Sequence, residues 1–397
     1  MSKSTYLSLL LAGAVMGCSE EVASEKEPTN RAYLVSATPM DTIPLQNLKG
    51  MAQLSGQKSV VDLVRHGVAT YKVVYNTPYK GTSIQASGLL YVPVGLQQPA
   101  PLISLQHGTT FVKKNAPSEN GSFSGIEYFA AAGYIAFMPD FIGYGASSEI
   151  FHPYYDQKHS ASSVVDGIKS VREFLEEKLI EYNDQLFLAG YSEGGYVTLA
   201  AAKELEANPT HGLPLTAVAA GAGGYDMEEM LRSVTGGRYY AYPAYLAFVL
   251  MAYNETNDWN KSLDYFFHEK YANALPALMA GESEGWQINS RLTSEVSKLL
   301  DPRFYAALSN PEGETELKKA LKENSVSGWK TSLPIRLYHG TRDEIIPAHN
   351  SEVTLANFQE LGSENVSLTL IPGGTHGSSF LPMLQQFIPW FETFRKK

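Results

Sequence analysis

From residue 71 to residue 371, the sequence alternates short apolar runs, rich in β-forming residues, with segments of helical periodicity. The runs cover residues 71–75, 85–92, 102–106, 134–138, 185–189, 215–220, 335–338 and 366–371. Strand patterns that alternate with helical patterns are typical of an open α/β sheet with helices on both faces. The sequence therefore predicts a mostly parallel, eight-stranded sheet flanked by helices.

No helical pattern separates the first two predicted strands. A turn signal from Pro78 to Gly81 joins them instead, so we expect an antiparallel hairpin at one edge of the sheet. Among the predicted helices, one opens directly after Ser192 and stops near Asn208 and Pro209. Another presents one apolar face to the sheet at helical spacing. The side chains of that face are Val164, Ile168, Val171 and Leu175.

Residues 224–333 break the alternation. They contain no convincing strand pattern, only helical segments that carry tyrosine and methionine and are interrupted by prolines. A structureless loop of this length inside a compact domain is rare. We therefore expect a mainly helical insertion, which divides the α/β domain into residues 59–223 and 334–397.

The composition supports a large folded domain and argues against one class of partner. The chain has 397 residues, of which 44% are hydrophobic and 18% are charged, so it can bury a sizeable core. Its 31 basic and 41 acidic residues give a formal net charge of -10. Because no basic block is present to follow a phosphate backbone, nucleic acid is not an expected partner.

The N-terminus has the layout of a cleaved export signal. Lys3 precedes an apolar run from Tyr6 to Met16, which is shorter than the roughly 20 apolar residues of a membrane-spanning helix. The segment from residue 15 to Cys18 resembles the lipobox of bacterial lipoproteins, whose cysteine becomes the lipidated first residue of the mature chain. Cys18 is the only cysteine of the chain, so it cannot form an internal disulfide.

This resemblance implies a signal peptide at residues 1–17 and an exported protein in the bacterial cell envelope. Fatty acyl chains such as palmitate on Cys18 would hold it at the membrane. Residues 18–58 would then form a polar tether and an N-terminal extension. The alternative is a plain secretory signal, in which Cys18 has no special role.

The strongest local motif runs from Gly190 through Tyr191, Ser192 and Glu193 to Gly194, and matches G-x-S-x-G. It lies between a predicted strand and a predicted helix. A nucleophilic serine of this kind stands on a strained strand-to-helix turn, where glycines let neighbouring backbone approach closely. The motif also occurs in ordinary turns, but its position after a buried strand favours Ser192 as a nucleophile.

A serine hydroxyl is a weak nucleophile, so it needs a base, and the base needs an acceptor that fixes its tautomer. The C-terminal third of the sequence offers both. Asp343 lies in the loop after the strand at 335–338, and His376 lies in a loop of small residues after the last strand. The chain order Ser192, Asp343, His376 is the one expected when the serine stands on such a turn. Glu344, directly beside Asp343, is the alternative acid.

Acyl transfer also needs donors for the negative charge that develops on the carbonyl oxygen, commonly two backbone N–H groups. We assign one to the amide of Glu193 and the other to Thr109, in the loop after the strand at 102–106. His107 in that loop is expected to be structural, since His376 already supplies the base. Asp140, in the glycine-bearing segment 139–147, is expected to stabilise a turn.

We expect neither a metal nor a cofactor. The nine histidines are scattered, no H-E-x-x-H motif occurs, and a single cysteine excludes a thiolate cluster. No G-x-G-x-x-G turn opens a helix after the first strand. The chemistry is therefore expected to rest on side chains and backbone amides.

With strands, serine turn, acid loop and histidine loop in this order, residues 60–394 resemble the α/β-hydrolase superfamily. The motif at 190–194 followed by Gly195, with a long insertion before the acid loop, is most similar to the secretory lipase family. The lone cysteine departs from the disulfide-bearing fungal members. The resemblance implies an α/β-hydrolase fold, hydrolysis of small-molecule or lipid esters through an acyl-enzyme on Ser192, and a cap or lid at 224–333.

The insertion carries more aromatic surface than one helical layer can bury, since each such side chain brings roughly 150–250 Å² that must be covered. We expect the surplus to face the substrate cleft, with Tyr191, Tyr245 and Phe248 in contact with the substrate. The aromatic side chains of this run are Tyr239, Tyr240, Tyr242, Tyr245, Phe248, Tyr253, Trp259, Tyr265, Phe266 and Phe267.

Other functions share this set of residues. A feruloyl or acetyl esterase that acts on polysaccharide side groups, or a serine peptidase, would use the same three side chains. A surface lipoprotein that keeps the fold only as a binding scaffold is a further alternative. Such a scaffold would not need Ser192, Asp343 and His376 together, so the sequence favours an esterase or lipase.

The lipobox resemblance yields a test of where the protein resides. Cys18→Ser should release or misprocess the protein and leave the catalytic constants of the folded domain unchanged, because acyl chains on Cys18 would supply the membrane affinity. The measurement is the amount of protein in membrane and soluble fractions of cells that express each form. Equal membrane-bound amounts of Cys18→Ser and wild type would contradict lipid attachment.

Overall fold

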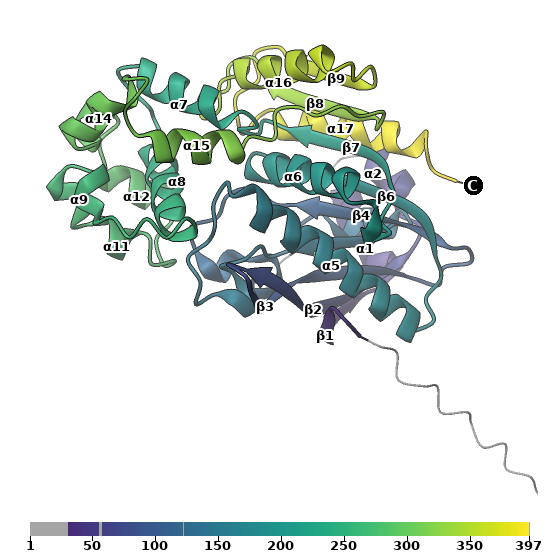
Figure 1. Ribbon diagram of the computed structural model, residues 1–397. Coiled ribbons are helices and arrows are strands. Elements are labelled where there is room, and N and C mark those ends of the chain that lie inside the picture. The colour runs from purple at the N-terminus through teal and green to yellow at the C-terminus, as the bar shows by residue number, and fades with distance from the viewer. Residues whose placement is uncertain (1–30, 55–57, 122, 397) are drawn as a thin grey trace, which may run out of the picture. The chain divides into compact units, whose positions relative to one another are not determined.

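The computed structural model describes residues 31–54, 58–121 and 123–396. The chain divides into two units, Met1–Asn30 and Arg31–Lys397. The first unit, with the predicted signal peptide, Cys18 and the start of the predicted tether, lies outside the described residues. The second unit contains the sheet, its flanking helices and the insertion (Figure 1).

A nine-stranded sheet forms the centre of the second unit, with the strand order β1-β2-β3-β5-β4-β6-β7-β8-β9. The first three strands and β5 pair antiparallel, and every pair from β5 through β4 to β9 is parallel. The strands are β1 (Leu34–Ile43), β2 (Gly67–Tyr79), β3 (Thr82–Val94), β4 (Ala100–Gln106), β5 (Ile135–Pro139), β6 (Tyr182–Tyr191), β7 (Leu215–Gly221), β8 (Ile335–Gly340) and β9 (Val366–Ile371).

All eight predicted runs are strands, and the predicted β2–β3 hairpin turns at Lys80 and Gly81, both with positive φ. Two details of the prediction are wrong. The sheet has a ninth strand, β1, and β1 rather than the hairpin forms the edge. β1 lies within the predicted N-terminal extension, and only Leu34 of its ten residues is buried. It therefore lacks the apolar run that identifies the other strands.

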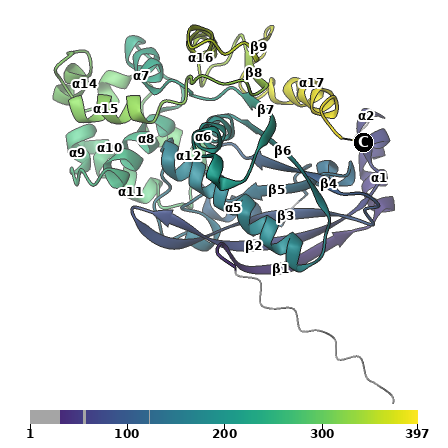
Figure 2. The same cartoon turned by 45° about the vertical axis from the view of Figure 1, so that its right-hand side comes forward.

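Helices cover both faces of the sheet (Figures 1 and 2). One apolar core includes side chains of α5 (Gln157–Glu177), α6 (Glu193–Ala207) and α16 (His349–Glu360). The core on the other face includes side chains of α1 (Leu45–Leu54), α4 (Glu127–Ala131) and α17 (Phe380–Glu392). The remaining short elements of the α/β part are α2 (Lys58–Leu63), α3 (Pro117–Asn120), η1 (Lys113–Asn115), η2 (Gly145–Ser147) and η3 (Pro209–His211).

The predicted helix with one apolar face and the predicted helix that opens after Ser192 are both confirmed. In α5, Val164, Ile168, Val171 and Leu175 are all buried. The side chain of Asp156 caps this helix by accepting a hydrogen bond from the backbone N–H of His159 (3.0 Å). α6 begins at Glu193 and ends at Ala207, before Pro209.

Residues 224–333 form helices and loops between β7 and β8, together with two isolated bridges. In Figure 1 these helices gather beside the carboxyl ends of the parallel strands. They form the predicted helical insertion, called the cap below. Its helices are α7 (Met227–Gly236), α8 (Pro243–Thr256), α9 (Leu263–Phe266), α10 (Glu269–Ala272), α11 (Leu275–Leu278), α12 (Gly285–Arg291), α13 (Val296–Leu299), α14 (Pro302–Leu308) and α15 (Thr315–Glu323).

Within the described residues, no helix has both the length and the apolar character needed to cross a membrane. The carboxyl ends of β4, β6, β8 and β9 lie at one edge of the sheet, where open α/β sheets commonly place their functional residues. The loops that follow these four strands carry the residues singled out from the sequence.

Candidate active site

Ser192 stands at the junction of β6 and α6. Its backbone has φ 60° and ψ −126°, a region that residues with a Cβ atom rarely adopt. The Ser192 N–H donates to Gly221 O at the end of β7 (2.8 Å), so the neighbouring strand holds this turn in place. Strain of this kind persists only where the surrounding structure enforces it, and it is frequent at active sites.

The first turn of α6 has no room for additional side-chain atoms. A Cβ atom at Gly194 would lie 2.0 Å from Gln106 O, and one at Gly195 would lie 2.4 Å from Gly221 O. Glycine at these two positions lets α6 begin between the ends of β4 and β7. This is the close backbone approach that the G-x-S-x-G motif predicts.

His376 connects Ser192 with Asp343. Its Nε2 atom lies 2.9 Å from Ser192 Oγ, and its Nδ1 atom lies 2.7 Å from Asp343 Oδ2. A carboxylate beside Nδ1 keeps the proton on that nitrogen, which leaves Nε2 free to accept the serine proton. The structure therefore brings together three residues that lie far apart in the sequence, on the loops after β6, β8 and β9.

The two candidate acids have different partners. Asp343 Oδ2 contacts the His376 ring, and Oδ1 accepts hydrogen bonds from the backbone N–H groups of Ile345 and Ile346 (2.9 Å each). Glu344 Oε2 instead accepts from the backbone N–H of His376 (3.1 Å). The geometry thus favours Asp343 as the partner of the imidazole and gives Glu344 a contact to the loop backbone.

The environment of Asp343 favours its charged form. The side chain is fully buried, and burial alone would raise the pKa of its carboxyl group. Hydrogen bonds from His339 and His376 and from the backbone outweigh burial, so the pKa of Asp343 lies far below its ordinary value. Asp343 is therefore a carboxylate wherever the protein is folded near neutral pH.

The histidine loop is held by two contacts that the sequence did not indicate. The Tyr191 hydroxyl donates to the backbone carbonyl of His376 (2.6 Å), and Glu344 accepts from its backbone N–H. Tyr191 also packs its ring 5.3 Å from the imidazole. Tyr191 is a predicted substrate contact, but its hydroxyl faces the His376 backbone.

The loop after β4 lies against Ser192 and against the first turn of α6. A Cβ atom at Gly108 would lie 3.7 Å from Ser192 Cβ, and Thr109 Oγ1 lies 2.8 Å from the Tyr154 hydroxyl. Glu193 is the first residue of α6, where backbone N–H groups have no acceptor within the helix. The two predicted oxyanion donors therefore lie on segments that flank Ser192.

His107 and Asp140 fix the loops around this site, as the sequence predicts. His107 stacks on Phe141 at 4.1 Å, and its Nε2 atom lies 3.2 Å from Asp140 O. Asp140 is fully buried and accepts hydrogen bonds from Ser87 and from both the hydroxyl and the backbone N–H of Ser118. Burial raises the pKa of Asp140, and these hydrogen bonds oppose the rise.

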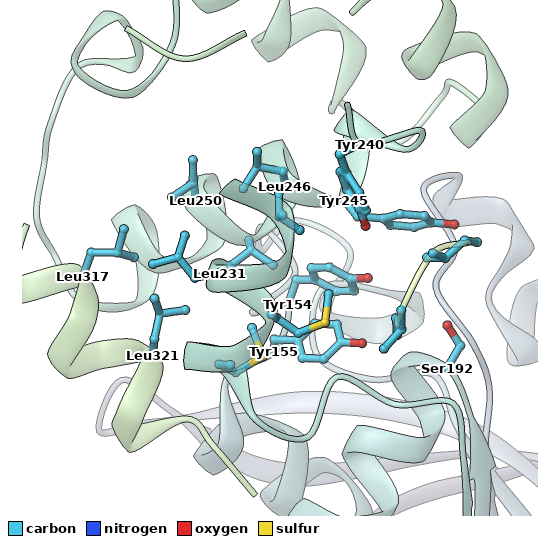
Figure 3. Close-up of a pocket in the computed structure, with 16 residues that line it drawn as sticks. Tyr154, Tyr155, Ser192, Leu231, Tyr240, Tyr245, Leu246, Leu250, Leu317 and Leu321 are labelled. Atoms are coloured by element: carbon cyan, nitrogen blue, oxygen red, sulfur yellow. The ribbon is translucent and has the colours of Figure 1, made fainter. Parts of the chain in front are cut away.

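A narrow apolar cavity of about 70 Å³ extends from Ser192 into the cap. Figure 3 shows tyrosines near Ser192 and leucines on the side away from it, including Leu250, Leu317 and Leu321. The lining residues are Tyr154, Tyr155, Ser192, Met227, Met230, Leu231, Val234, Tyr240, Tyr245, Leu246, Val249, Leu250, Leu317, Leu321, Ile345 and Ile346.

The tyrosines of this cavity are neutral hydrogen-bonding groups. Burial raises the pKa of the Tyr245 hydroxyl to about 12. It raises the pKa values of Tyr154, Tyr155 and Tyr240 still further above the ordinary tyrosine value. The cavity therefore changes along its length, from aromatic rings with neutral hydroxyls near the serine to aliphatic side chains at the far side.

The aromatic side chains of the cap divide between three environments. Tyr240 and Tyr245 line the cavity, whereas Phe266 and Phe267 are buried in the cap itself and Tyr239 is exposed. Phe248, a predicted substrate contact, is not among the lining residues. Its ring stacks on Tyr154 at 4.6 Å and packs at a tilt against Phe111 at 5.1 Å, so it supports the cavity wall from behind.

Within residues 31–54, 58–121 and 123–396, no group of three or more histidine, cysteine, aspartate or glutamate side chains is arranged to hold a metal ion. The groups gathered at Ser192 are a hydroxyl, an imidazole, a carboxylate and backbone amides. This arrangement can move a proton from a hydroxyl and stabilise an oxyanion.

A family model described as secretory lipase matches residues 125–390. A search of curated proteins found no match. Among solved structures, a protein described as a hydrolase from Legionella pneumophila is 27% identical, with a TM-score of 0.82. The match covers 92% of this chain and 99% of that one.

Two further solved structures share the fold at lower identity. The rice cell wall degrading esterase LipA from Xanthomonas oryzae is 22% identical, with a TM-score of 0.80, and the match covers 92% of this chain and all of that one (100%). Candida antarctica lipase A is 14% identical, with a TM-score of 0.67 and coverages of 92% and 83%. Both likenesses confirm the α/β-hydrolase fold.

The low pKa of Asp343 predicts a pH dependence of stability. Above pH about 5, roughly one unit above the ordinary aspartate pKa, the carboxylate is ionised in the folded and unfolded states alike and its contribution to stability is constant. Below that pH the unfolded chain takes up the proton first, so the free energy of unfolding should fall, by about 1 kcal/mol at pH 3 for this one group. Urea unfolding at pH 6, 5, 4 and 3 measures it.

Asp343→Asn is the control for that measurement, because its amide does not titrate. The acid-induced loss of stability should be smaller in Asp343→Asn than in wild type by about the same 1 kcal/mol. Parallel curves for the two proteins over this pH range would contradict the assignment of a low pKa to Asp343.

Proposed function

This chain belongs to the secretory lipase family and hydrolyses carboxylic esters, and we propose that Ser192 is its nucleophile, His376 its general base and Asp343 the acid that orients His376. The observation that carries the proposal is the unbroken chain of contacts from Ser192 Oγ through His376 to Asp343. It stands at the mouth of an apolar cavity to which Ser192 itself contributes.

In the first half of the reaction, His376 Nε2 takes the hydroxyl proton of Ser192 while Oγ attacks the ester carbonyl carbon. The carbonyl oxygen becomes an oxyanion, and the backbone N–H groups of Glu193 and Thr109 donate hydrogen bonds to it. The tetrahedral intermediate collapses when His376 returns the proton to the alcohol oxygen. The alcohol leaves, and the acyl group remains as an ester of Ser192.

In the second half, His376 takes a proton from a water molecule, whose oxygen attacks the acyl carbon on Ser192. A second oxyanion forms at the same two N–H groups. When it collapses, His376 returns the proton to Ser192 Oγ and the carboxylic acid leaves. Throughout this cycle Asp343 remains a carboxylate and stabilises the imidazolium form of His376.

The lining of the cavity indicates which part of the ester binds in the cap, namely the acyl chain. Its aliphatic walls match a hydrocarbon chain, in which each buried methylene contributes about 0.8 kcal/mol. The hydroxyls of Tyr154, Tyr155, Tyr240 and Tyr245 lie nearer Ser192, where the polar ester group would bind. We therefore place a slender aliphatic acyl group in this cavity.

Export agrees with membership of a secretory family. Within that general location, we propose that Cys18 carries the lipid anchor implied by its lipobox. Residues 18–30 would link the anchor to the unit that begins at Arg31. This placement would hold the ester hydrolase at a membrane surface of the cell envelope.

Substitutions in the three proposed catalytic residues test their roles. Ser192→Ala and His376→Ala should each lower kcat by about 10⁶-fold, as in other serine hydrolases, and leave the protein folded. Asp343→Asn should lower kcat by about 10⁴-fold, because the imidazole loses its tautomer and orientation. Steady-state hydrolysis of a p-nitrophenyl ester measures these values, and circular dichroism checks the fold.

Glu344→Gln is the matched control for Asp343→Asn, since it neutralises the adjacent carboxylate. We expect kcat to fall less in Glu344→Gln than in Asp343→Asn, because among the triad residues Glu344 contacts only the backbone of His376. A variant Asp343→Asn that keeps most activity, alongside an inactive Glu344→Gln, would transfer the acid role to Glu344.

The cavity walls predict how the enzyme selects acyl length. Leu321→Phe places a larger side chain at the far side of the cavity, so the preferred acyl chain should become shorter by several methylenes. Tyr245→Ala removes a ring from the cavity wall near Ser192, so it should change the relative kcat/KM of the esters through the part of the acyl group next to the carbonyl. The measurement is kcat/KM for esters from acetyl to decanoyl in each variant.

Leu361→Phe is the control for the acyl series, because Leu361 is exposed and is not among the cavity-lining residues. Its acyl profile should match that of wild type. A wild-type preference for acetyl esters that neither Leu321→Phe nor Tyr245→Ala alters would contradict the acyl cavity and favour an acetyl esterase of polysaccharides.

A further inference from the structure

A buried histidine and a buried glutamate meet directly behind the nucleophile. His152 Nε2 lies 2.6 Å from Glu193 Oε1, and the two side chains are only 6% and 2% exposed. Glu193 is the residue that follows Ser192, and His152 lies 41 positions before it in the sequence. The catalytic cycle proposed above uses only the backbone of Glu193, so it leaves this pair without a function.

The contacts of His152 define how many protons the pair holds. His152 Nδ1 lies 2.6 Å from Ile142 O, and a carbonyl oxygen can only accept, so Nδ1 carries a proton. One further proton must lie between Nε2 and Glu193 Oε1, because two bare acceptors would repel each other at 2.6 Å. The pair is therefore neutral overall, whether the second proton belongs to the imidazole or to the carboxyl group.

The glycine-bearing segment 139–147, which the sequence analysis singled out, packs against His152. Gly143, in the segment 139–147, has φ +97°, and a Cβ atom there would lie 2.6 Å from His152 Cα. This glycine lets the loop pass against His152 and present Ile142 O to its Nδ1 atom. The next residue, Tyr144, packs its ring 4.9 Å from His152 and donates its hydroxyl proton to Thr110 O.

A second connection leads from His152 to Thr109. The backbone carbonyl of His152 accepts from the N–H of Tyr154 (2.8 Å), and the Tyr154 hydroxyl lies 2.8 Å from Thr109 Oγ1. The loop after β4 is therefore held at Thr109 through Tyr154 and at Thr110 through Tyr144. Both tyrosines adjoin His152.

These contacts place His152 between the two segments that carry the predicted oxyanion donors. We propose that His152 is a positioning residue for the oxyanion hole: it holds the α6 start through the Glu193 side chain and the Thr109 loop through Tyr154 and Tyr144. The inference rests on the proposed function, since it assigns the Glu193 and Thr109 amides to the oxyanion. It adds a residue that touches neither the substrate nor the reacting atoms.

Two physical features make this arrangement stiff. Glu193 Oε2 is buried and has no hydrogen-bond partner among the described residues, so the carboxyl group depends on His152 alone for its pairing. The imidazole is also enclosed by aromatic rings, with Phe248 at 5.7 Å and Phe141 at 6.2 Å. Loss of His152 would leave a buried, unpaired carboxyl group beside the nucleophile, and the start of α6 would shift to relieve it.

The test is His152→Phe, assayed as the full chain by steady-state hydrolysis of a p-nitrophenyl ester. Phenylalanine keeps the ring packing and the backbone bond to Tyr154. It removes the two side-chain hydrogen bonds, to Ile142 O and to Glu193 Oε1, so it tests the contact that holds the start of α6. Oxyanion contacts form fully only in the transition state, and small displacements there cost up to about 10²-fold. We expect kcat to fall by about 10-fold to 100-fold, with KM within about 3-fold of wild type.

A double-variant cycle and a conservative substitution separate positioning from general destabilisation. If His152 acts through Glu193, the double variant His152→Phe with Glu193→Met should lose no more than about 3-fold beyond His152→Phe alone. Glu193→Gln can still donate to a neutral His152, so it should retain at least about 5-fold more kcat than Glu193→Met. If His152→Phe does not fold, the comparison of kcat between Glu193→Gln and Glu193→Met tests the inference by itself, and equal kcat values for these two variants would overturn it.

His211→Gln is the matched control, because His211 pairs with Glu204 (2.9 Å) near the other end of α6. It should leave kcat unchanged. The inference would be overturned if His152→Phe had wild-type kcat, lost activity only through KM, or lost no more than His211→Gln. It would also be overturned if the losses in kcat of His152→Phe and Glu193→Met multiplied fully in the double variant. An active Ser192→Ala would overturn the proposed function instead, so the two failures are distinguishable.

Discussion

The active site depends on one strained turn, at which β6 gives way to α6. Ser192 holds a positive φ there because its backbone N–H is bonded to the end of β7 and because α6 starts against the ends of β4 and β7. Such strain costs on the order of 1–3 kcal/mol. Glycine at positions 194 and 195 makes the required close packing feasible, and parallel strands buried on both faces make it rigid.

Everything else at the site is arranged around that turn. The loops after β8 and β9 bring Asp343 and His376 to it, and Tyr191 and Glu344 hold the histidine loop from both sides of its backbone. The cap between β7 and β8 adds an apolar cavity that begins at Ser192. The α/β part thus supplies the chemistry, and the cap, inserted where the chain leaves the sheet, supplies the apolar surface for the substrate.

Sequence patterns predicted those parts of the structure that depend on local chemistry. Eight strands were predictable because their segments are rich in apolar and β-forming residues, whereas β1 has one buried residue in ten and carries no such signal. Ser192, Asp343 and His376 follow from motif and chain order. The direction in which a side chain points does not follow from the sequence. Phe248 and Tyr191, both predicted to contact the substrate, show this: Phe248 lies behind Tyr154, and the hydroxyl of Tyr191 faces the His376 backbone. His152 was not predictable, because no motif marks it and nothing in the sequence connects it with Glu193, 41 positions away.

The central claim is that the strained turn presents Ser192 as the nucleophile of an assembled triad. Its most direct test is to treat the full chain with a fluorophosphonate, which reacts with serines activated by a neighbouring base, and to locate the adduct by peptide mass spectrometry. The account predicts a single adduct on Ser192, formed in step with the loss of ester hydrolysis. Inactivation accompanied by an adduct on another residue, or full hydrolytic activity with Ser192 completely modified, would contradict it.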